Sequence, residues 1–150
     1  MTDAARARVI LLADDDSDDQ LLVKDAIADC GWQGELHFVD NGEQLLDYLL
    51  RRGKYGKGET APTPGLILLD LNMPKRDGRE ALRQIRADAS LRRIPVVVLT
   101  TSKADTDIGQ LYDLGANSFV SKPVDFHSLV QVMRSLGDYW FKTVQLPVQK

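Results

Sequence analysis

The chain has 150 residues, of which 43% are hydrophobic and 27% charged, a composition that fits one folded domain and excludes a disordered chain. A single cysteine excludes an internal disulfide and a cysteine-rich zinc site. The net charge of -3 gives no broad basic surface for nucleic acid, and no apolar run is long enough to cross a bilayer. We therefore expect a cytoplasmic protein that binds neither nucleic acid nor membrane and acts through a local site.

The first half of the chain alternates short apolar runs with segments of helical spacing. Residues 9–13 are apolar in succession, as expected for a strand that is covered on both faces. A helix is predicted from Ser17, where Gln20 completes a capping-box pattern, and Gly31 ends it. Its predicted inward side chains are Leu21, Leu22, Ala26 and Ile27. A second strand at residues 35–39 leads to Asn41-Gly42 and a leucine-rich helix.

The second half continues this alternation after residues 51–65, which are rich in glycine and proline and are interpreted as an exposed connection. Further strands are predicted at residues 66–69, 96–99 and 119–120. The helices between and after them are predicted from Gly78, from a Ser102 cap and from an Asp125 cap, the last with Phe126, Leu129, Val130, Met133 and Leu136 on one face. Strands that alternate with helices predict a parallel sheet with helices on both faces.

Polar side chains directly follow several of these strands. They are Asp14, Asp15 and Asp16 after the first strand, Asp70 after the third, Thr100 and Thr101 after the fourth, and Ser121 and Lys122 after the fifth. In open parallel sheets, ligands bind beyond the carboxyl ends of the strands, where the strand order reverses. With the order 2-1-3-4-5, the first and third strands are neighbours at that point. Asp14 and Asp15 would then lie beside Asp70.

A crowd of carboxylates at one edge of the sheet predicts a metal site. Like charges held close raise each other's pKa unless a cation lies between them, and oxygen ligands suit Mg²⁺. Lys122 and Thr100 would add an ammonium and a hydroxyl, and this set of groups suits a phosphoryl group. Since the chain has no Gly-x-x-x-x-Gly-Lys loop for a nucleotide, we interpret Asp70 as a nucleophile that accepts phosphate covalently. Asp14 and Asp15 are better placed as metal ligands.

Four short motifs, taken in this order, resemble the receiver domain of two-component response regulators. They are Leu11-Leu12-Ala13-Asp14-Asp15, Leu68-Leu69-Asp70-Leu71-Asn72-Met73-Pro74 with Asp77-Gly78, Val98-Leu99-Thr100, and Lys122-Pro123. Each motif is weak alone, but together they form a specific signal. The resemblance implies a flavodoxin-like α/β fold, a doubly wound five-stranded parallel sheet of order 2-1-3-4-5. The receiver domain would cover residues 1–136, and residues 137–150 would form a C-terminal extension.

The resemblance also implies a role for each site residue. Asp70 would take a phosphoryl group from a sensor histidine kinase. Mg²⁺ would bind Asp15, Asp70 and the main-chain carbonyl of Asn72, while Asp14 would act through a water. The Lys122-Pro123 peptide bond is expected to be cis.

A phosphorylation switch is implied at two further positions. Thr100 would turn toward the phosphoryl group, and Phe119, three residues before Lys122, would follow it inward and reshape the nearby surface. Thr101 stands where a smaller residue is frequent in the family, and its bulk is expected to slow access to Asp70. Because the sequence ends at Lys150, we expect output through a partner or a dimer rather than a fused DNA-binding domain.

A narrower likeness lies in residues 51–65, 70–82 and 139–147. These segments resemble single-domain regulators that partner phytochrome-type light-sensing histidine kinases, so the implied partner is a bacteriophytochrome. The tail also carries apolar side chains beyond the last element that the fold needs: Trp140, Phe141, Val144 and Leu146. Because a monomer rarely exposes so much apolar surface, we expect a homodimer contact that includes this tail and the last helix, the alternative being a tail that packs on its own domain.

Two other classes of function remain open at this point. A Mg²⁺-dependent phosphohydrolase could also use Asp70 as its nucleophile, although enzymes of the haloacid dehalogenase type have a second aspartate where this chain has Asn72. A receiver-like interaction module without phosphorylation is the third reading. The intact set of Asp14, Asp15, Asp70, Thr100 and Lys122 argues against it.

Overall fold

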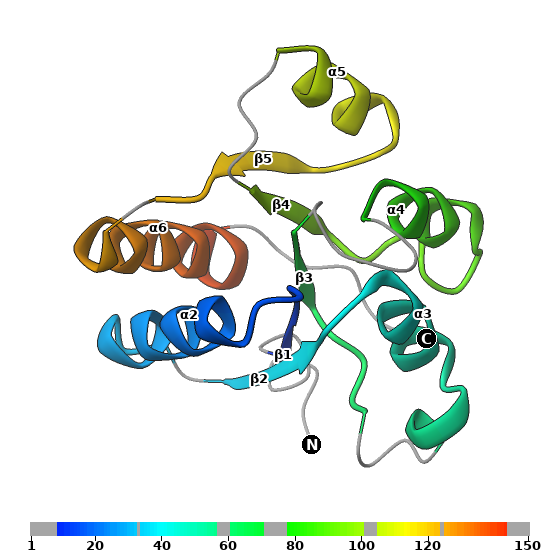
Figure 1. Ribbon diagram of the computed structural model, residues 1–150, viewed down its shortest axis with the longest axis horizontal. Coiled ribbons are helices and arrows are strands. Elements are labelled where there is room, and N and C mark those ends of the chain that lie inside the picture. Colours follow the sequence, from blue (N-terminus) through cyan, green and yellow to red (C-terminus); the bar gives the residue numbers. More distant parts are fainter. Residues whose placement is uncertain are drawn as a thin grey trace.

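The computed structural model describes residues 9–32, 34–56, 61–70, 78–100, 105–123 and 125–143. Its centre is a five-stranded sheet in which every strand pair is parallel, in the order β2-β1-β3-β4-β5 (Figure 1). The strands are β1 (Val9–Ala13), β2 (Glu35–Val39), β3 (Leu66–Leu69), β4 (Val96–Thr100) and β5 (Ser118–Ser121). This order confirms the doubly wound α/β fold that was predicted.

Helices cover both faces of the sheet. They are α2 (Ser17–Asp29), α3 (Gly42–Leu50), α4 (Gly78–Ala87), α5 (Asp105–Asp113) and α6 (Phe126–Asp138), with the short turns η1 (Gly53–Tyr55) and η3 (Tyr139–Thr143). Helices α2 and α6 lie side by side on one face, and α3 and α4 lie on the other (Figure 1). Two apolar clusters result, one under α2 and α6 and one under α3, α4 and α5.

The central strands are apolar at successive positions because both of their faces are covered. All five residues of β1 and all four of β3 are buried, whereas the edge strand β2 is buried only at Val39. Successive side chains of β1 enter opposite clusters: Leu11 packs under α3 and α4, and Leu12 packs under α2 and α6. The sheet is therefore a rigid platform whose strand ends are fixed in place.

Helix α2 begins at Ser17 as predicted, but a different residue caps its N-terminus. Its N-cap is Asp16, whose side chain accepts hydrogen bonds from the backbone N–H groups of Asp18 and Asp19, so the proposed Ser17–Gln20 capping box is wrong. Leu21 and Leu22, expected to point inward, are 56% and 44% exposed. The buried stripe begins at Val23, and a helix turns by about 100° per residue, so Leu22 is rotated from Val23 by about 100° and Leu21 by about 200°.

Helix α6 is capped by the side chain of Asp125, which accepts a hydrogen bond from the Ser128 N–H, as predicted. Leu129, Val130, Met133 and Leu136 are buried as expected, but Phe126 is 41% exposed. Since Phe126 is the first residue of α6, no earlier turn of the helix shields it. In the part of the chain that the structure describes, no helix has the length and apolarity to span a membrane.

The connection after α3 is held to the domain at its described positions. Arg51 ends α3 in the left-handed region, with φ 56°, and its guanidinium donates to the carbonyl of Ala61 and the hydroxyl of Thr63. The Tyr48 hydroxyl donates to the Pro62 carbonyl, at 2.8 Å. The expectation of an exposed connection is therefore wrong at Ala61, Pro64 and Gly65, which are buried where the chain lies against the core.

Candidate functional site

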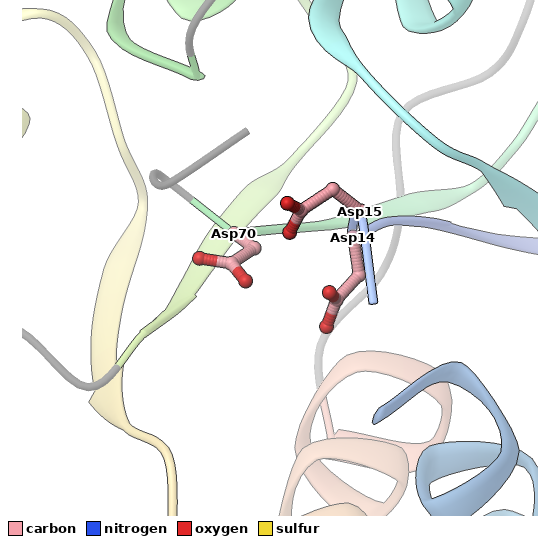
Figure 2. A group of neighbouring side chains, drawn as sticks. All are labelled: Asp14, Asp15 and Asp70. Carbon is pink, nitrogen blue, oxygen red and sulfur yellow. The ribbon is translucent and has the colours of Figure 1, made fainter. Parts of the chain in front are cut away.

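The candidate site lies at the carboxyl ends of β1 and β3, which are adjacent in the sheet. Asp14 follows β1 and Asp70 follows β3, and the Asp70 N–H donates to the carbonyl of Ala13, at 2.9 Å. Carboxylate oxygens of Asp14, Asp15 and Asp70 lie within 4.8 Å of one another. Figure 2 shows the three carboxyl groups gathered around these two strand ends. The predicted convergence of Asp14, Asp15 and Asp70 is therefore present.

Lys122 brings a positive charge to this cluster from the end of β5. Its Nζ lies 3.1 Å from Asp14 Oδ2 and 3.3 Å from Asp70 Oδ2. A third carboxylate, Asp19 from the first turn of α2, contacts the same nitrogen at 3.0 Å. Because an ammonium has three N–H donors, these contacts provide one acceptor for each donor.

Burial sets the electrostatics of the site. Desolvation raises the pKa of Asp14 to about 6, although the Asp16 N–H and the Lys122 ammonium favour its charged form. For Lys122, burial lowers the pKa, but the carboxylates of Asp70 and Asp14 raise it by more, so the net shift is upward. The ammonium therefore stays protonated, while the charged form of Asp14 is poorly compensated.

This donor set fits a hard divalent cation. Asp14 and Asp70 are buried and Asp15 is exposed, so a bound ion would contact protein oxygen on one side and water on the other. A divalent charge would also offset the desolvation that penalises the ionised Asp14 carboxylate. Asp14, Asp15 and Asp70 could thus hold a metal, as the sequence predicted.

A second layer of hydrogen bonds fixes the loop that carries Asp14. Gln20 of α2 donates through Nε2 to the Asp14 carbonyl at 2.6 Å and to Asp40 Oδ1 at 2.9 Å. The Asp40 N–H in turn donates to Gln44 Oε1 of α3. Neither this role of Gln20 nor the contact of Asp19 was predicted from the sequence, because only the polar residues that directly follow a strand were considered for the site.

The remaining predicted positions are described in part. Thr100 ends β4 and pairs with Ser121 of β5, but its side chain, Asn72 and Thr101 lie outside the described residues. Phe119 of β5 is partly buried against the core, and its N–H donates to the Tyr112 hydroxyl at 3.3 Å. The described residues contain no cis peptide bond, so the expected cis Lys122-Pro123 bond is wrong. For a bond before proline, trans is intrinsically favoured by about 0.5–1 kcal/mol.

The sequence matches the response regulator receiver domain family over residues 10–134. The chain belongs to this family, whose members of this type are signalling proteins rather than enzymes. It is similar to "Response regulator Rcp1" of Synechocystis sp., with 39% identity over 140 residues that cover 93% of each chain.

Solved structures of response regulators are also similar to this chain. The phosphorylated cyanobacterial phytochrome response regulator RcpA superimposes with a TM-score of 0.86 at 39% identity, covering 93% of this chain and 98% of that one. Regulator RPA3017, described in red light signalling of R. palustris, gives a TM-score of 0.90 at 36% identity, with 94% and 99% covered. The Mn²⁺-bound form of Rcp1 gives 0.84 at 38% identity, with 94% and 99% covered. The chain is thus similar to phytochrome response regulators over more than nine tenths of its length.

Proposed function

We propose that this chain is a single-domain response regulator that accepts a phosphoryl group on Asp70 from a sensor histidine kinase. The observation that carries the proposal is the meeting of three carboxylates within 4.8 Å with the Lys122 ammonium 3.3 Å from Asp70. These groups come from the ends of three different strands, and the topology of the parallel sheet brings all three ends to one edge. Together they form a charge pattern suited to a phosphoryl group.

The reaction follows from the chemistry of these side chains. An oxygen of Asp70 attacks phosphorus, the bond between phosphorus and the kinase histidine nitrogen breaks, and the nitrogen keeps that electron pair. The product is an acyl phosphate on Asp70. Lys122 donates to a phosphoryl oxygen and offsets part of its negative charge. Mg²⁺, held by Asp14, Asp15, Asp70 and the Asn72 carbonyl, would neutralise further charge and help to orient the phosphoryl oxygens.

The signal leaves the site through a change of surface. Phosphorylation adds negative charge beside Lys122, and Thr100 and Phe119 respond by moving toward the phosphoryl group. The partly buried position of Phe119 supports this role, because an inward movement would change the surface around β5 and its flanking helices. Fluorine NMR of fluorinated Phe119 tests it: its resonance should shift on phosphorylation of the wild type and stay in place in Asp70→Asn.

The proposed kinase is of the phytochrome type, such as a bacteriophytochrome, and the regulator would act beside it in the cytoplasm. The names of the similar proteins support this proposal, since RcpA is a phytochrome response regulator and RPA3017 belongs to red light signalling. Phosphotransfer to wild type and Asp70→Asn, read by intact mass, tests both site and partner. We expect one added phosphoryl group on the wild type only, and faster transfer from phytochrome-type kinases than from unrelated ones.

Other results, in this experiment or in a phosphatase assay, would favour another function or another acceptor residue. Steady turnover of an added phosphomonoester would support a phosphohydrolase, whereas a single incorporation would not. A wild type that takes no phosphoryl group from any kinase would favour an interaction module. Labelling that persists in Asp70→Asn would move the acceptor to another residue.

We also propose that residues 137–150 form an extension to a receiver domain of residues 1–136, and that this extension contributes to a homodimer. Trp140 and Phe141 pack in part against their own domain, so the contact we propose depends more on Val144 and Leu146, which lie outside the described residues. Light scattering of Val144→Ser/Leu146→Ser against the control Gln149→Ser tests it. The proposal requires a dimer mass that falls only in the double variant, and an equal mass for all three chains would refute it.

A further inference from the structure

We propose that Asp19 is a positioning residue that holds the Lys122 ammonium in place for phosphoryl transfer at Asp70. This inference rests on the proposed function and extends it to a side chain that neither binds the metal nor receives the phosphoryl group. Asp19 Oδ2 lies 3.0 Å from Lys122 Nζ, which is closer than either Asp14 or Asp70.

The three partners of Lys122 surround its ammonium unequally. Asp14 is almost fully buried and Asp70 nearly so, with side chains 1% and 10% exposed, whereas the Asp19 side chain is 34% exposed. Asp19 therefore supplies the contact on the solvent side of the ammonium. Without it, one N–H donor of Lys122 would face water, and the flexible four-carbon side chain would lose one of its fixed points.

The start of α2 explains why Asp19 reaches the site. The Asp16 cap makes Asp19 the third residue of the helix, and helical side chains point back toward the N-terminus. That direction leads from the first turn of α2 to the end of β1, where Lys122 meets Asp14. Asp18, the preceding residue, is exposed and is not among the carboxylates that contact Lys122.

Phosphorylation needs only one of the three contacts to change. When Asp70 becomes an acyl phosphate, the N–H of Lys122 that donated to the Asp70 carboxylate can donate instead to a phosphoryl oxygen on the same residue. The contacts to Asp14 and Asp19 can stay in place and orient the ammonium throughout. Asp19 thus acts through Lys122 rather than on the phosphoryl group itself.

The test compares Asp19→Asn with Asp18→Asn, which removes the same charge from the same helical turn. Labelling by acetyl phosphate with Mg²⁺ should be roughly tenfold slower in Asp19→Asn, because misplaced reacting groups cost factors of this order or more. Hydrolysis of the acyl phosphate should also slow, since the same ammonium assists both steps. Asp18→Asn should stay near the wild-type rates, and Asp19→Glu, which keeps the carboxylate, should recover most of the rate.

A second readout follows Lys122 without any phosphate. A buried ammonium held by three carboxylates exchanges its protons slowly, so ¹⁵N-detected NMR of lysine side chains should give a sharp Lys122 signal in wild type and Asp18→Asn. The signal should broaden or vanish in Asp19→Asn while circular dichroism remains native. A merely structural role for Asp19 would leave this signal unchanged in a folded variant.

The outcomes separate this inference from the proposed function. A wild type that takes no label overturns both. A labelled wild type in which Asp19→Asn matches Asp18→Asn in rates and keeps the Lys122 signal overturns the role of Asp19 alone. Slower labelling with an unchanged signal would also overturn it, because the effect would then not pass through Lys122.

Discussion

The indole ring of Trp32 lies against the backbone of Gly137 and occupies the space that a Cβ atom there would need. Trp32 comes from the connection between α2 and β2, and Gly137 is in the last turn of α6. The same ring meets Phe141 of η3 edge-on, with 5.1 Å between the ring centroids. The start of the extension therefore packs on the domain through one aromatic side chain.

Gly137→Ala should destabilise the protein even though alanine is the better helix former. The gain in helix propensity is about 1 kcal/mol, but overlap with a packed ring costs about 1–3 kcal/mol. Urea unfolding measures the difference. Gly109→Ala in α5 is the control, because open space surrounds that position, and it should be neutral or stabilising. In a Trp32→Leu background, Gly137→Ala should lose its penalty, and a penalty that persists there would contradict this packing.

The ionisation of Asp14 should make a measurable contribution to the pH dependence of the free energy of unfolding. Burial raises the pKa of its folded form from 3.8 to about 6, so between these values the folded state binds a proton that the unfolded state has lost. The contribution of Asp14 to the free energy of unfolding must therefore fall as pH rises from about 4 to 6. The full effect is at most about 3 kcal/mol, since each pKa unit corresponds to 1.36 kcal/mol.

Unfolding of wild type and Asp14→Asn between pH 4 and pH 7 measures this effect. In the absence of metal, the free energy of unfolding of Asp14→Asn should increase relative to that of the wild type as pH rises. Mg²⁺ should restore wild-type stability at pH 7 and have little effect at pH 4, because a divalent ion favours the ionised carboxylate. Parallel stability curves for the two proteins would contradict the prediction.

Asp15→Asn should weaken Mg²⁺ binding without lowering stability. Asp15 is exposed, so the fold does not depend on its burial, but one carboxylate of the cluster would be lost. We expect at least about a tenfold weaker affinity by isothermal titration calorimetry, since even the loss of a residue that hydrogen-bonds to a metal ligand costs this much. Asp18→Asn, with the same change of charge nearby, should bind Mg²⁺ almost as the wild type does. An equal loss of Mg²⁺ affinity in both variants would show that the effect comes from the change in net charge and not from a lost ligand.

Arg86 of α4 should contribute more to stability than Arg83 of the same helix. Its guanidinium donates to the carbonyls of Gly115, Arg92 and Ile94 and to Asn117 Oδ1, which joins α4 to the segments on either side of β4. Arg86→Met should cost about 2–3 kcal/mol in urea unfolding, because it removes the charged donor from the part-buried carbonyls of Gly115 and Ile94. Arg83→Met on the same helix removes only an exposed pair with Glu80 and should cost less than about 0.5 kcal/mol. Similar costs would contradict the role of Arg86.

The sheet and its order could be predicted because buried strands appear in the sequence as short runs of apolar residues. β1 and β3 are apolar at every position, and an aspartate directly follows each of them, so the edge that carries Asp14 and Asp70 follows from the alternation of strands and helices. Lys122 could be assigned to the same edge because it follows β5. Side chains at strand ends have their place fixed by the backbone topology alone.

The orientation of side chains on helices was harder to predict, because the same apolar residues can be assigned to more than one inward face. The residues of α2 that pack inward are Val23, Ala26 and Ile27, whereas Leu21 and Leu22 were assigned to this face because they are apolar. Asp19 reaches Lys122 from the first turn of this helix, which Asp16 caps. A stricter use of helix-cap geometry, with Asp16 rather than Ser17 as the cap, is the one signal that could have found it.

The central claim is that Asp70 is a metal-dependent phosphoacceptor, and intact mass after incubation with acetyl phosphate tests it most directly. The wild type should gain one phosphoryl group with Mg²⁺ and almost none after chelation, and tandem mass spectrometry should locate it on Asp70. Asp70→Asn should gain nothing under either condition. Equal labelling of Asp70→Asn and wild type, or labelling that is indifferent to Mg²⁺, would contradict the account.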